Sequence, residues 1–587
     1  MKVKMMAGLL ATGMALCLLT SCANPDSAFD GIPLSYDDQI REGGIKDDGR
    51  FNKTLFFRND TELRASDPQV IYISDTQSEE FGYYYLYGTT SPDSGYEAYR
   101  SKDLQEWEAL SPQKGFLAFT PPKNNIVQQA FWAPEVIFDA ETKLYYMFYT
   151  GSLSGEGDWG NKYPCVAVSE QPYGPFAPST EAGLDATKLL IDKNKANAAV
   201  EEASRGDWIV IDQSPFVGAD GNRYLLFCRV SDPGDNGKDS VWGVKMNSWS
   251  EPDYSTLVRL MSVGYLTTDK TEKAEYEAAS PRDEGPHMYV RKRDDGTVTY
   301  YLTASINGLS DYTVIQSVSD SPLGPFRKLT EEEGGVILAN DHLQWDHLRG
   351  PGHHCFIEVE DELYIVYHQQ GDRQNGEGWD RYIAIDRVSF TKNLKGEEIM
   401  YINGPTWSLQ PQVNAVAEYR NIASQATITT TAGTNTEALT DGLLSLYKSV
   451  DYVKEFETDK TTVITLDFGD YREIQALMIY NSKWYEKAFP YIYRVEFDFK
   501  NDQLPDGETA FIDKLAFDWK SYKNNNIDEM RPGGSAVAVF APLLVKTIRI
   551  TLKLPLERPE ELELLDDEGY VVDQTVAAIS EIVVLGK

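Results

Sequence analysis

Short apolar strands, each opened by a polar residue, return at regular intervals along the first two thirds of the chain. Each copy continues into a turn of Asp, Gly or Asn and then into a Tyr-rich strand. The openings lie at residues 67–70, 132–136, 212–216, 284–288 and 352–356, a period of roughly 70 residues. Units of four short strands repeated around an axis form a β-propeller. The pattern therefore predicts a five-bladed propeller over residues 46–405, with the opening strand of each blade innermost.

The pattern changes after Asn403-Gly404-Pro405. Alternating, β-branched segments such as 461–469 and 545–550 follow, separated by long connections. No long amphipathic helix stands out. The alternation predicts a β-sandwich of the jelly-roll type over residues 412–587, so that the whole chain belongs to the all-β class.

The first residues are typical of an export signal. Lys2 and Lys4 precede an apolar stretch over residues 5–19, which is too short for a comfortable membrane span. Leu19-Thr20-Ser21-Cys22 resembles the bacterial lipobox, which implies a signal peptide over residues 1–21 and lipidation of Cys22. A plain signal peptide with a chance cysteine is the alternative. Residues 22–45 are polar and predict a tether. We expect an outer-membrane lipoprotein that faces the periplasm or the cell surface, with the lipid as its one contact with the membrane.

Charge and cysteine content narrow the classes of partner. Lys and Arg number 55 and Asp and Glu 91, a net charge of −36, which repels phosphate backbones and argues against nucleic acid. Cys165, Cys228 and Cys355 lie far apart in strand-like apolar runs, so we expect buried free thiols and neither disulfides nor a zinc site.

Three of the repeat openings begin with an acid: Asp67, Asp212 and Glu284. In a propeller these side chains converge on one central pocket. Hydrolysis of a glycosidic bond needs one carboxylate as base or nucleophile and one carboxylic acid to protonate the leaving oxygen. A third carboxylate raises the pKa of the acid by repulsion. The plain alternative is that each Asp merely stabilises a turn.

These segments resemble the motifs of glycoside hydrolase family 43, whose members are five-bladed propellers. Ser66-Asp67-Pro68 matches the motif of the general base, 211–215 that of the pKa modulator, and Glu284-Gly285-Pro286-His287 that of the general acid. The resemblance therefore implies Asp67 as base, Asp212 as modulator and Glu284 as acid. The family inverts anomeric configuration, so the carboxyls of base and acid are expected roughly 6.5–9.5 Å apart.

The resemblance also implies residues that contact substrate. Arg381 matches an arginine that reaches the bound sugar, and His353 lies where the family places a histidine near the sugar or a central ion. Glu135 stands where many relatives carry Asp, and it binds a sugar hydroxyl, binds an ion or is structural. Trp132 either stacks on a sugar ring at the rim or packs between blades. No cofactor is expected; a structural calcium or sodium ion held by His353 through water stays an open alternative.

The C-terminal segments 421–424, 439–442, 464–469 and 579–582 look like the discoidin, or coagulation factor V/VIII type C, fold, which family 32 carbohydrate-binding modules share. The candidate sugar-binding residues of this domain are Trp484, Tyr485 and Trp519. The alternative is that this domain only braces the propeller.

Together these features predict an inverting exo-glycosidase that acts on side chains of a plant oligo- or polysaccharide. α-L-Arabinofuranosidase or β-D-xylosidase activity is the first expectation. β-Galactofuranosidase and exo-galactanase are alternatives within the same family. A glycan-binding lipoprotein without hydrolytic activity is the alternative from another class, although it has no need of three central acids.

Overall fold

The structure is a computed structural model. It describes residues 53–587 except 60, 62, 91–92, 158–159, 341–348, 371–380, 407, 447–451, 485–486, 488–493, 501–509, 513–515, 518–532, 553 and 555–574. The predicted signal peptide, the lipidation site Cys22, the tether and residues 46–52 of the predicted propeller lie outside the described residues. None of the helices within the described ranges is long and apolar enough to cross a membrane.

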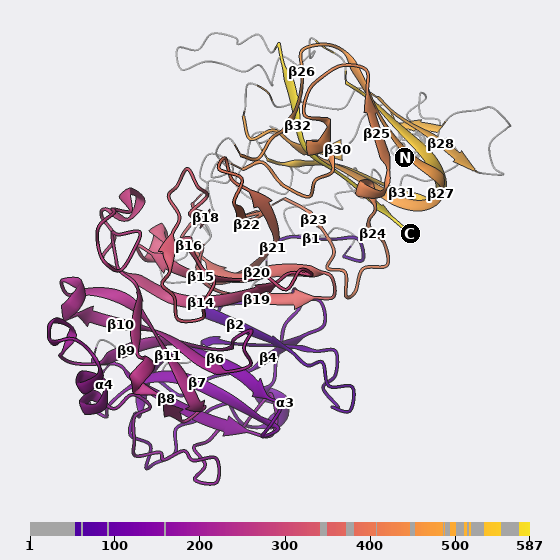
Figure 1. Ribbon diagram of the computed structural model, residues 1–587. Helices are drawn as coiled ribbons and strands as arrows, with labels where there is room; N and C mark the ends of the chain where they lie inside the picture. The colour runs from indigo at the N-terminus through magenta and orange to yellow at the C-terminus, as the bar shows by residue number, and fades with distance from the viewer. Residues whose placement is uncertain are drawn as a thin grey trace, which may run out of the picture. The chain divides into compact units, whose positions relative to one another are not determined.

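The first part of the chain forms five antiparallel sheets, one for each sequence repeat (Figure 1). Neighbouring first strands contact each other in the order β2, β6, β9, β14, β19 and then β2 again. The ring is a five-bladed β-propeller, and this expectation from the repeat is confirmed. The innermost strands are β2 (Ser66–Tyr72), β6 (Gln129–Asp139), β9 (Ile209–Val217), β14 (Asp283–Lys292) and β19 (Gly352–Val359).

The remaining strands of each blade follow in sequence order outward from the axis. The second strands are β3 (Tyr84–Thr89), β7 (Leu144–Ser152), β10 (Arg223–Asp232), β15 (Val298–Ile306) and β20 (Glu362–Gln369). The outer strands are β4 (Tyr99–Ser101), β5 (Glu108–Ala109), β8 (Tyr163–Ser169), β11 (Lys238–Ser248), β12 (Glu251–Pro252), β13 (Val258–Met261), β16 (Thr313–Ser319), β17 (Arg327–Lys328), β18 (Val336–Leu338), β21 (Tyr382–Lys392) and β22 (Glu398–Ile402). Two short strands, β1 (Phe56–Phe57) and β23 (Gln410–Pro411), and two short helices, α3 (Ser111–Lys114) and α4 (Lys193–Ala199), complete this part.

Apolar side chains fill the wedges between neighbouring blades. Between blades 1 and 2, for example, Tyr85 of β3 and Tyr149 of β7 pack in one cluster with Phe119 and Phe131. The Tyr-rich second strands thus supply large rings to a space that widens away from the axis. The three cysteines Cys165, Cys228 and Cys355 are buried and free, as the sequence predicts.

The chain divides into two compact units. Of the described residues, one comprises those within Phe57–Ala417 and Leu443–Val453, and the other those within Glu418–Gly442 and Lys454–Lys587. In the first, Tyr401 of β22 packs against Leu443 and Val453, so a short excursion of the chain returns to the fifth blade.

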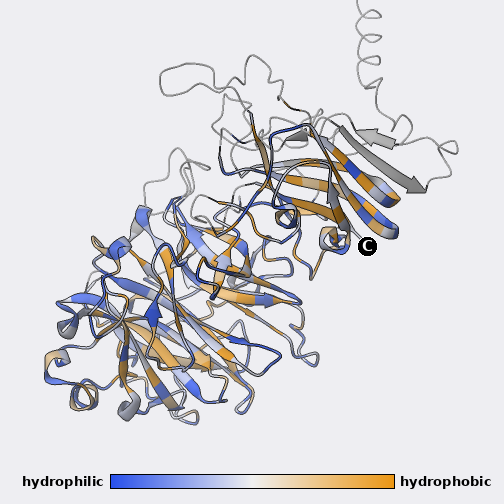
Figure 2. Cartoon of the chain, turned by 45° about the horizontal axis from the view of Figure 1, so that its top comes forward, coloured by the Kyte–Doolittle hydropathy of each residue, from blue (hydrophilic) through white to orange (hydrophobic). Residues whose placement is uncertain are grey.

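The second unit is built from antiparallel strands, as expected. Its strands β27 and β31 are long, and their pairing is interrupted between Asp467 and Arg472. Before that point buried and exposed positions alternate along β27, and Figure 2 shows apolar and polar bands along these strands. The described strands of this unit belong to one hydrogen-bonded sheet, so the two-layered sandwich stays a prediction. The strands are β24 (Arg420–Asn421), β25 (Thr427–Thr430), β26 (Phe456–Thr458), β27 (Thr462–Asn481), β28 (Arg494–Lys500), β29 (Ala510–Ile512), β30 (Ala516–Phe517), β31 (Ser535–Leu552) and β32 (Ala577–Gly586).

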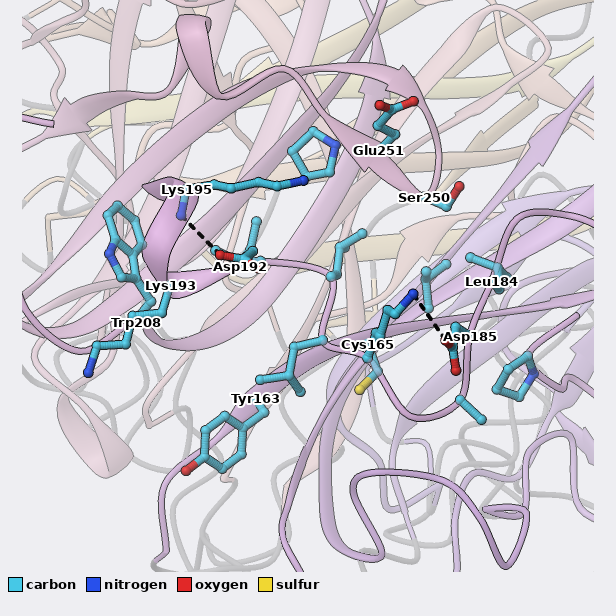
Figure 3. Close-up of a pocket in the computed structure, with 18 of the residues that line it drawn as sticks. Tyr163, Cys165, Leu184, Asp185, Asp192, Lys193, Lys195, Trp208, Ser250 and Glu251 are labelled. Atoms are coloured by element: carbon cyan, nitrogen blue, oxygen red, sulfur yellow. Dashed lines mark hydrogen bonds and ion pairs between the residues drawn. The ribbon is translucent and has the colours of Figure 1, made fainter. Parts of the chain in front are cut away.

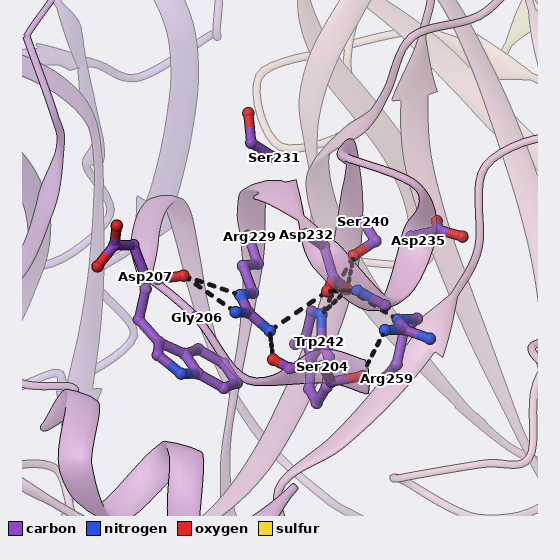
Figure 4. A network of polar contacts seen from close by, with 12 residues as sticks. Ser204, Gly206, Asp207, Arg229, Ser231, Asp232, Asp235, Ser240, Trp242 and Arg259 are labelled. Carbon is purple, nitrogen blue, oxygen red and sulfur yellow. Dashed lines mark hydrogen bonds and ion pairs between the residues drawn. The ribbon is translucent and has the colours of Figure 1, made fainter. Parts of the chain in front are cut away.

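A buried ionic network fixes the third blade (Figure 4). Asp232 accepts hydrogen bonds from Arg229 at 3.3 Å, from Arg259 at 2.8 Å and from the indole of Trp242 at 3.0 Å. Arg229 also donates to the carbonyl of Ser204 at 2.7 Å. Because the charges are paired and hydrogen-bonded, their burial is tolerated.

A second buried cluster lies beside the strand that carries Glu284. The Lys328 ammonium contacts Glu277 at 2.6 Å and Asp283 at 2.7 Å, and all three side chains are almost fully buried. Lys328 also donates to the carbonyl of Ser262. One cation thus holds two carboxylates, and one of these directly precedes Glu284 in β14.

We expect Lys328→Met to lower the free energy of unfolding of the propeller by about 3–5 kcal/mol at neutral pH, because it leaves two buried carboxylates without their cation. Urea unfolding followed by tryptophan fluorescence measures this loss. Lys395→Met is the matched control: Lys395 pairs with Glu333 but is 62% exposed, so its loss is expected below about 1 kcal/mol. Equal losses in the two variants would contradict the cluster's stabilising role.

Candidate active site

Each of the five innermost strands bends at the same point near its start. The backbone takes a positive φ at Asp67 (53°), Ala133 (41°), Asp212 (55°), Gly285 (56°) and His353 (41°). At each of these points the ladder to the second strand is interrupted. Such a bulge re-aims a side chain, and left-handed backbone at residues other than glycine is typical of functional sites. Asp67, Asp212 and His353 are thus structural equivalents, whereas Glu284 precedes the equivalent position by one residue.

Asp67 is held by groups from the first and fifth blades. Its Oδ2 accepts a hydrogen bond from Thr89 at 2.7 Å, and its Oδ1 accepts one from Arg381 Nη1 at 3.2 Å. Nδ1 of His353 lies 3.3 Å from the same Oδ1. The backbone N–H of Asp67 donates to Nδ1 of His368 at 3.1 Å. The orientation of this carboxylate is therefore fixed.

Asp212 and Glu284 are linked through the backbone. The N–H of Gly285 donates to Asp212 Oδ2 at 2.9 Å, so the modulator candidate binds the residue directly after the acid candidate. Glu284 accepts a short hydrogen bond from Tyr312 OH at Oε1. Arg282 Nη1 lies 3.4 Å from Oε1 and 3.3 Å from Oε2 of Glu284.

These environments shift the two buried carboxyls in the same direction. Burial raises the pKa of Asp212 to about 7, and the negative charge of Asp67 adds to the rise. Burial raises the pKa of Glu284 to about 7 as well; the charge of Asp212 adds to it, while Arg282 and the Tyr312 hydroxyl oppose it. Near neutral pH these two carboxyls therefore carry protons part of the time, which suits a proton donor.

The buried histidines near the axis are neutral. Burial lowers the pKa values of His287, His353, His354 and His368 below the usual range. His368 accepts a hydrogen bond at Nδ1, so its proton is on Nε2. Of the adjacent pair, His353 faces Asp67, whereas His354 shares a 2.7 Å hydrogen bond with Thr303.

The predicted substrate contacts Glu135 and Trp132 differ in burial. Glu135 lies in β6 two residues after the bend at Ala133 and is buried. Burial raises its pKa well above the usual range, although a hydrogen bond with Ser214 opposes the shift. Trp132 is half-buried, and the ammonium of Lys162 lies 4.1 Å from the centre of its ring. Arg381 is directed at Asp67.

Of the C-terminal candidates for sugar binding, Trp484 is partly exposed. Tyr485 and Trp519 lie outside the described residues.

Four residues of this cluster have no assigned role in the sequence analysis. Thr89, Arg282 and Tyr312 bind the acids directly, and His368 binds the backbone of Asp67. His368 lies near the end of the second strand of the fifth repeat, and Arg282 lies two residues before Glu284. Thr89 ends the second strand of the first blade, and Tyr312 follows that of the fourth blade; the repeat has no common motif at these points.

Within the described ranges, no group of three or more His, Cys, Asp and Glu side chains is arranged to hold a metal ion. The proposal of a central calcium or sodium ion held by His353 through water is not tested by this geometry.

A cavity of about 570 Å³ lies away from the acids, between blades 2 and 3 (Figure 3). Tyr163 and Cys165 of β8 and Trp208 line it, with the segment around Asp192. Its polar groups largely bind one another; Asp192, for example, caps α4 and accepts from the backbone of Lys195. Neither Asp67, Asp212 nor Glu284 lines this cavity.

Comparison with known proteins agrees with the geometry. The family model described as glycosyl hydrolases family 43 matches residues 61–394, more than half of the chain. No curated protein matches the chain. A solved thermostable family-43 glycoside hydrolase is 24% identical over 61% of this chain and 99% of its own, with a TM-score of 0.43. An endo-1,4-β-xylanase from Bacteroides thetaiotaomicron is 23% identical over 59% and 96%, with a TM-score of 0.40. An α-L-arabinofuranosidase from Lactobacillus brevis is 17% identical over 58% and 95%, with a TM-score of 0.41.

Gly285→Ala is expected to destabilise the propeller more than an ordinary glycine substitution. A Cβ at residue 285 lies 3.1 Å from the His353 ring and also forces a side chain onto φ +56°. Gly296, in the turn of the same blade, is the control, because it has φ +82° and nothing within 4 Å of an added Cβ. We expect about 1–2 kcal/mol for Gly296→Ala and a clearly larger loss for Gly285→Ala in urea unfolding. Equal losses would mean that the His353 ring moves away from the added methyl group without a measurable loss of stability.

Proposed function

The chain belongs to glycoside hydrolase family 43, and we propose that it is an inverting exo-glycosidase that removes α-L-arabinofuranose or β-D-xylose from side chains of plant polysaccharides. The observation that supports this proposal is the division of the three central acids between two environments. Asp67 accepts hydrogen bonds from a guanidinium and a hydroxyl, while Asp212 and Glu284 are buried with raised pKa values. One ionised and one protonated carboxyl are what inversion requires.

In the proposed mechanism Asp67 takes a proton from a water molecule as that water attacks the anomeric carbon. Arg381 and Thr89 orient this carboxylate through hydrogen bonds to its two oxygens. Glu284 gives its proton to the leaving oxygen. Tyr312 donates to Oε1 of Glu284 and orients this carboxyl. Asp212 raises the pKa of Glu284 and binds the backbone N–H that follows it.

The proposal extends to the parts of the chain outside the propeller. We propose that Cys22 carries a lipid that anchors the enzyme in a bacterial outer membrane, and that the C-terminal unit is a discoidin-like carbohydrate-binding module. The signal pattern and the alternating C-terminal strands support these statements. Radiolabelled palmitate incorporated by the wild type and absent from Cys22→Ala tests the anchor.

A panel of aryl glycosides tests the activity itself: α-L-arabinofuranoside, β-D-xyloside, β-D-galactofuranoside and β-D-galactopyranoside. We expect hydrolysis of the first or second, with the inverted anomer as the first product in proton NMR. Asp67→Asn should lower kcat by several orders of magnitude while its unfolding curve stays that of the wild type, because the water loses its base. A retained anomeric configuration, or full activity in Asp67→Asn, would overturn the proposed mechanism.

The role of Glu284 predicts a pH dependence. Because its pKa is about 7 and its protonated form is the active one, kcat/KM should fall as the pH rises through about 7. Glu284→Gln should remove this basic limb. The same variant should lose far more activity on alkyl than on nitrophenyl glycosides, since a good leaving group needs little protonation. Equal losses on both substrates would contradict Glu284 as the acid.

A further inference from the structure

We propose that Arg282 forms a binding site for a negatively charged leaving group, so that the sugar to be removed is attached to an acidic residue such as a uronic acid. The inference rests on the proposed function, because it takes Glu284 as the acid that faces the leaving oxygen. It adds the chemical class of the residue on the far side of the cleaved bond.

The two arginines near the acids are divided between the two sides of the reaction. Arg381 binds Asp67, the base candidate, at 3.2 Å. Arg282 instead lies 3.3 Å from Glu284, the acid candidate. Since the acid gives its proton to the leaving oxygen, the leaving group lies against the Glu284 carboxyl. A cation beside that carboxyl is therefore within reach of the leaving group and remote from the attacking water.

The guanidinium of Arg282 has unused donors. Of its nitrogen atoms only Nη1 has a hydrogen-bond partner among the described residues, and that partner is Glu284 at long distances. Nε is buried without a partner. The side chain is nevertheless 38% exposed, compared with 14% for Arg381. A guanidinium that is partly open and only weakly bound retains the capacity to bind a carboxylate through two parallel hydrogen bonds.

The reaction changes the charge that faces Arg282. While Glu284 carries its proton, it offers the guanidinium no negative charge. The charge of Asp239 also acts on Arg282, but no hydrogen bond joins these two side chains among the described residues, and Asp239 Oδ1 accepts from the N–H of Ser231 at 2.8 Å. A carboxylate on the leaving sugar supplies a partner that can form hydrogen bonds with the guanidinium. After proton transfer Glu284 is itself a carboxylate, so it competes for the guanidinium and favours departure of the anionic product.

The net charge of −36 does not oppose this local binding. At physiological ionic strength the Debye length is about 8 Å, so distant carboxylates are largely screened while a guanidinium in contact is not. The preference for an anionic leaving group should therefore persist as salt is added, because salt screens the distant repulsion more than the contact with Arg282.

Paired substrates test the inference without altering the protein. The 2-, 3- and 4-(carboxymethyl)phenyl α-L-arabinofuranosides carry the carboxylate at three distances, and their methyl esters are neutral twins. A methylene group separates the carboxyl from the ring, so acid and ester are nearly equal as leaving groups. If the aryl panel selects another sugar, the same aglycones are placed on it. For at least one isomer we expect the acid to have a kcat/KM about tenfold above that of its ester.

Variants assign the preference to Arg282. The readout is the acid-to-ester ratio within each enzyme, because any effect of Arg282 on the pKa of Glu284 acts equally on both substrates. Arg282→Gln should bring the ratio to about one or below, and Arg282→Lys should keep part of it. Arg293→Gln is the control: Arg293 pairs with Glu398 away from the acids, so the ratio should be unchanged.

A wild-type ratio of one or less for all three isomers would overturn the inference, as would an undiminished ratio in Arg282→Gln. In either case hydrolysis of the esters leaves the proposed function standing. Hydrolysis of none of the six compounds by the wild type would count against both proposals.

Discussion

The bend of the five innermost strands into left-handed backbone is the constraint on which the candidate site depends. At four of the five positions the residue is not glycine, and each such residue costs roughly 1–2 kcal/mol. Neighbouring blades offset this cost. The N–H of Asp67 binds His368 of the fifth blade, and the N–H of His353 binds Ser305 of the fourth. The bends and the closed ring therefore stabilise each other, and the acids come together only in the complete propeller.

The bend also decides which residues face the axis. In a regular strand neighbouring side chains alternate, so Asp67 and Gln69 share one face. The bulge interrupts this alternation, and it places Asp67, Asp212 and His353 at equivalent points. In the fourth blade glycine occupies that point, and the acid stands one residue earlier. The resulting asymmetry lets Glu284 lie between Arg282 and Tyr312 while the amide of Gly285 binds Asp212.

The sequence predicts the propeller well because every blade has the same packing requirements. Each blade needs an apolar first strand and a second strand with large side chains. Tyrosines such as Tyr85 and Tyr149 fill the wedge between blades. The same repeat brings Asp67 and Asp212 into register. It does not predict Thr89 or Tyr312, since one ends a second strand and the other follows one, where the sequences of the blades differ. It also does not reveal the bulge, which depends on hydrogen bonds between blades that are far apart in the chain.

The surroundings of the acids differ in burial and in neighbouring charge more than in their cations. Asp67 accepts hydrogen bonds from Arg381 and Thr89 through both oxygens. Glu284 accepts one from Tyr312 and also lies beside a guanidinium. The arginine distances are nearly equal, 3.2 Å to Asp67 and 3.3 Å to Glu284, so the approach of an arginine does not decide the state of the acid. Burial raises the pKa of Glu284 to about 7, the charge of Asp212 adds to the rise, and Arg282 opposes it. Because burial outweighs the attraction of the guanidinium, a cation lies beside the acid without ending its capacity to donate a proton.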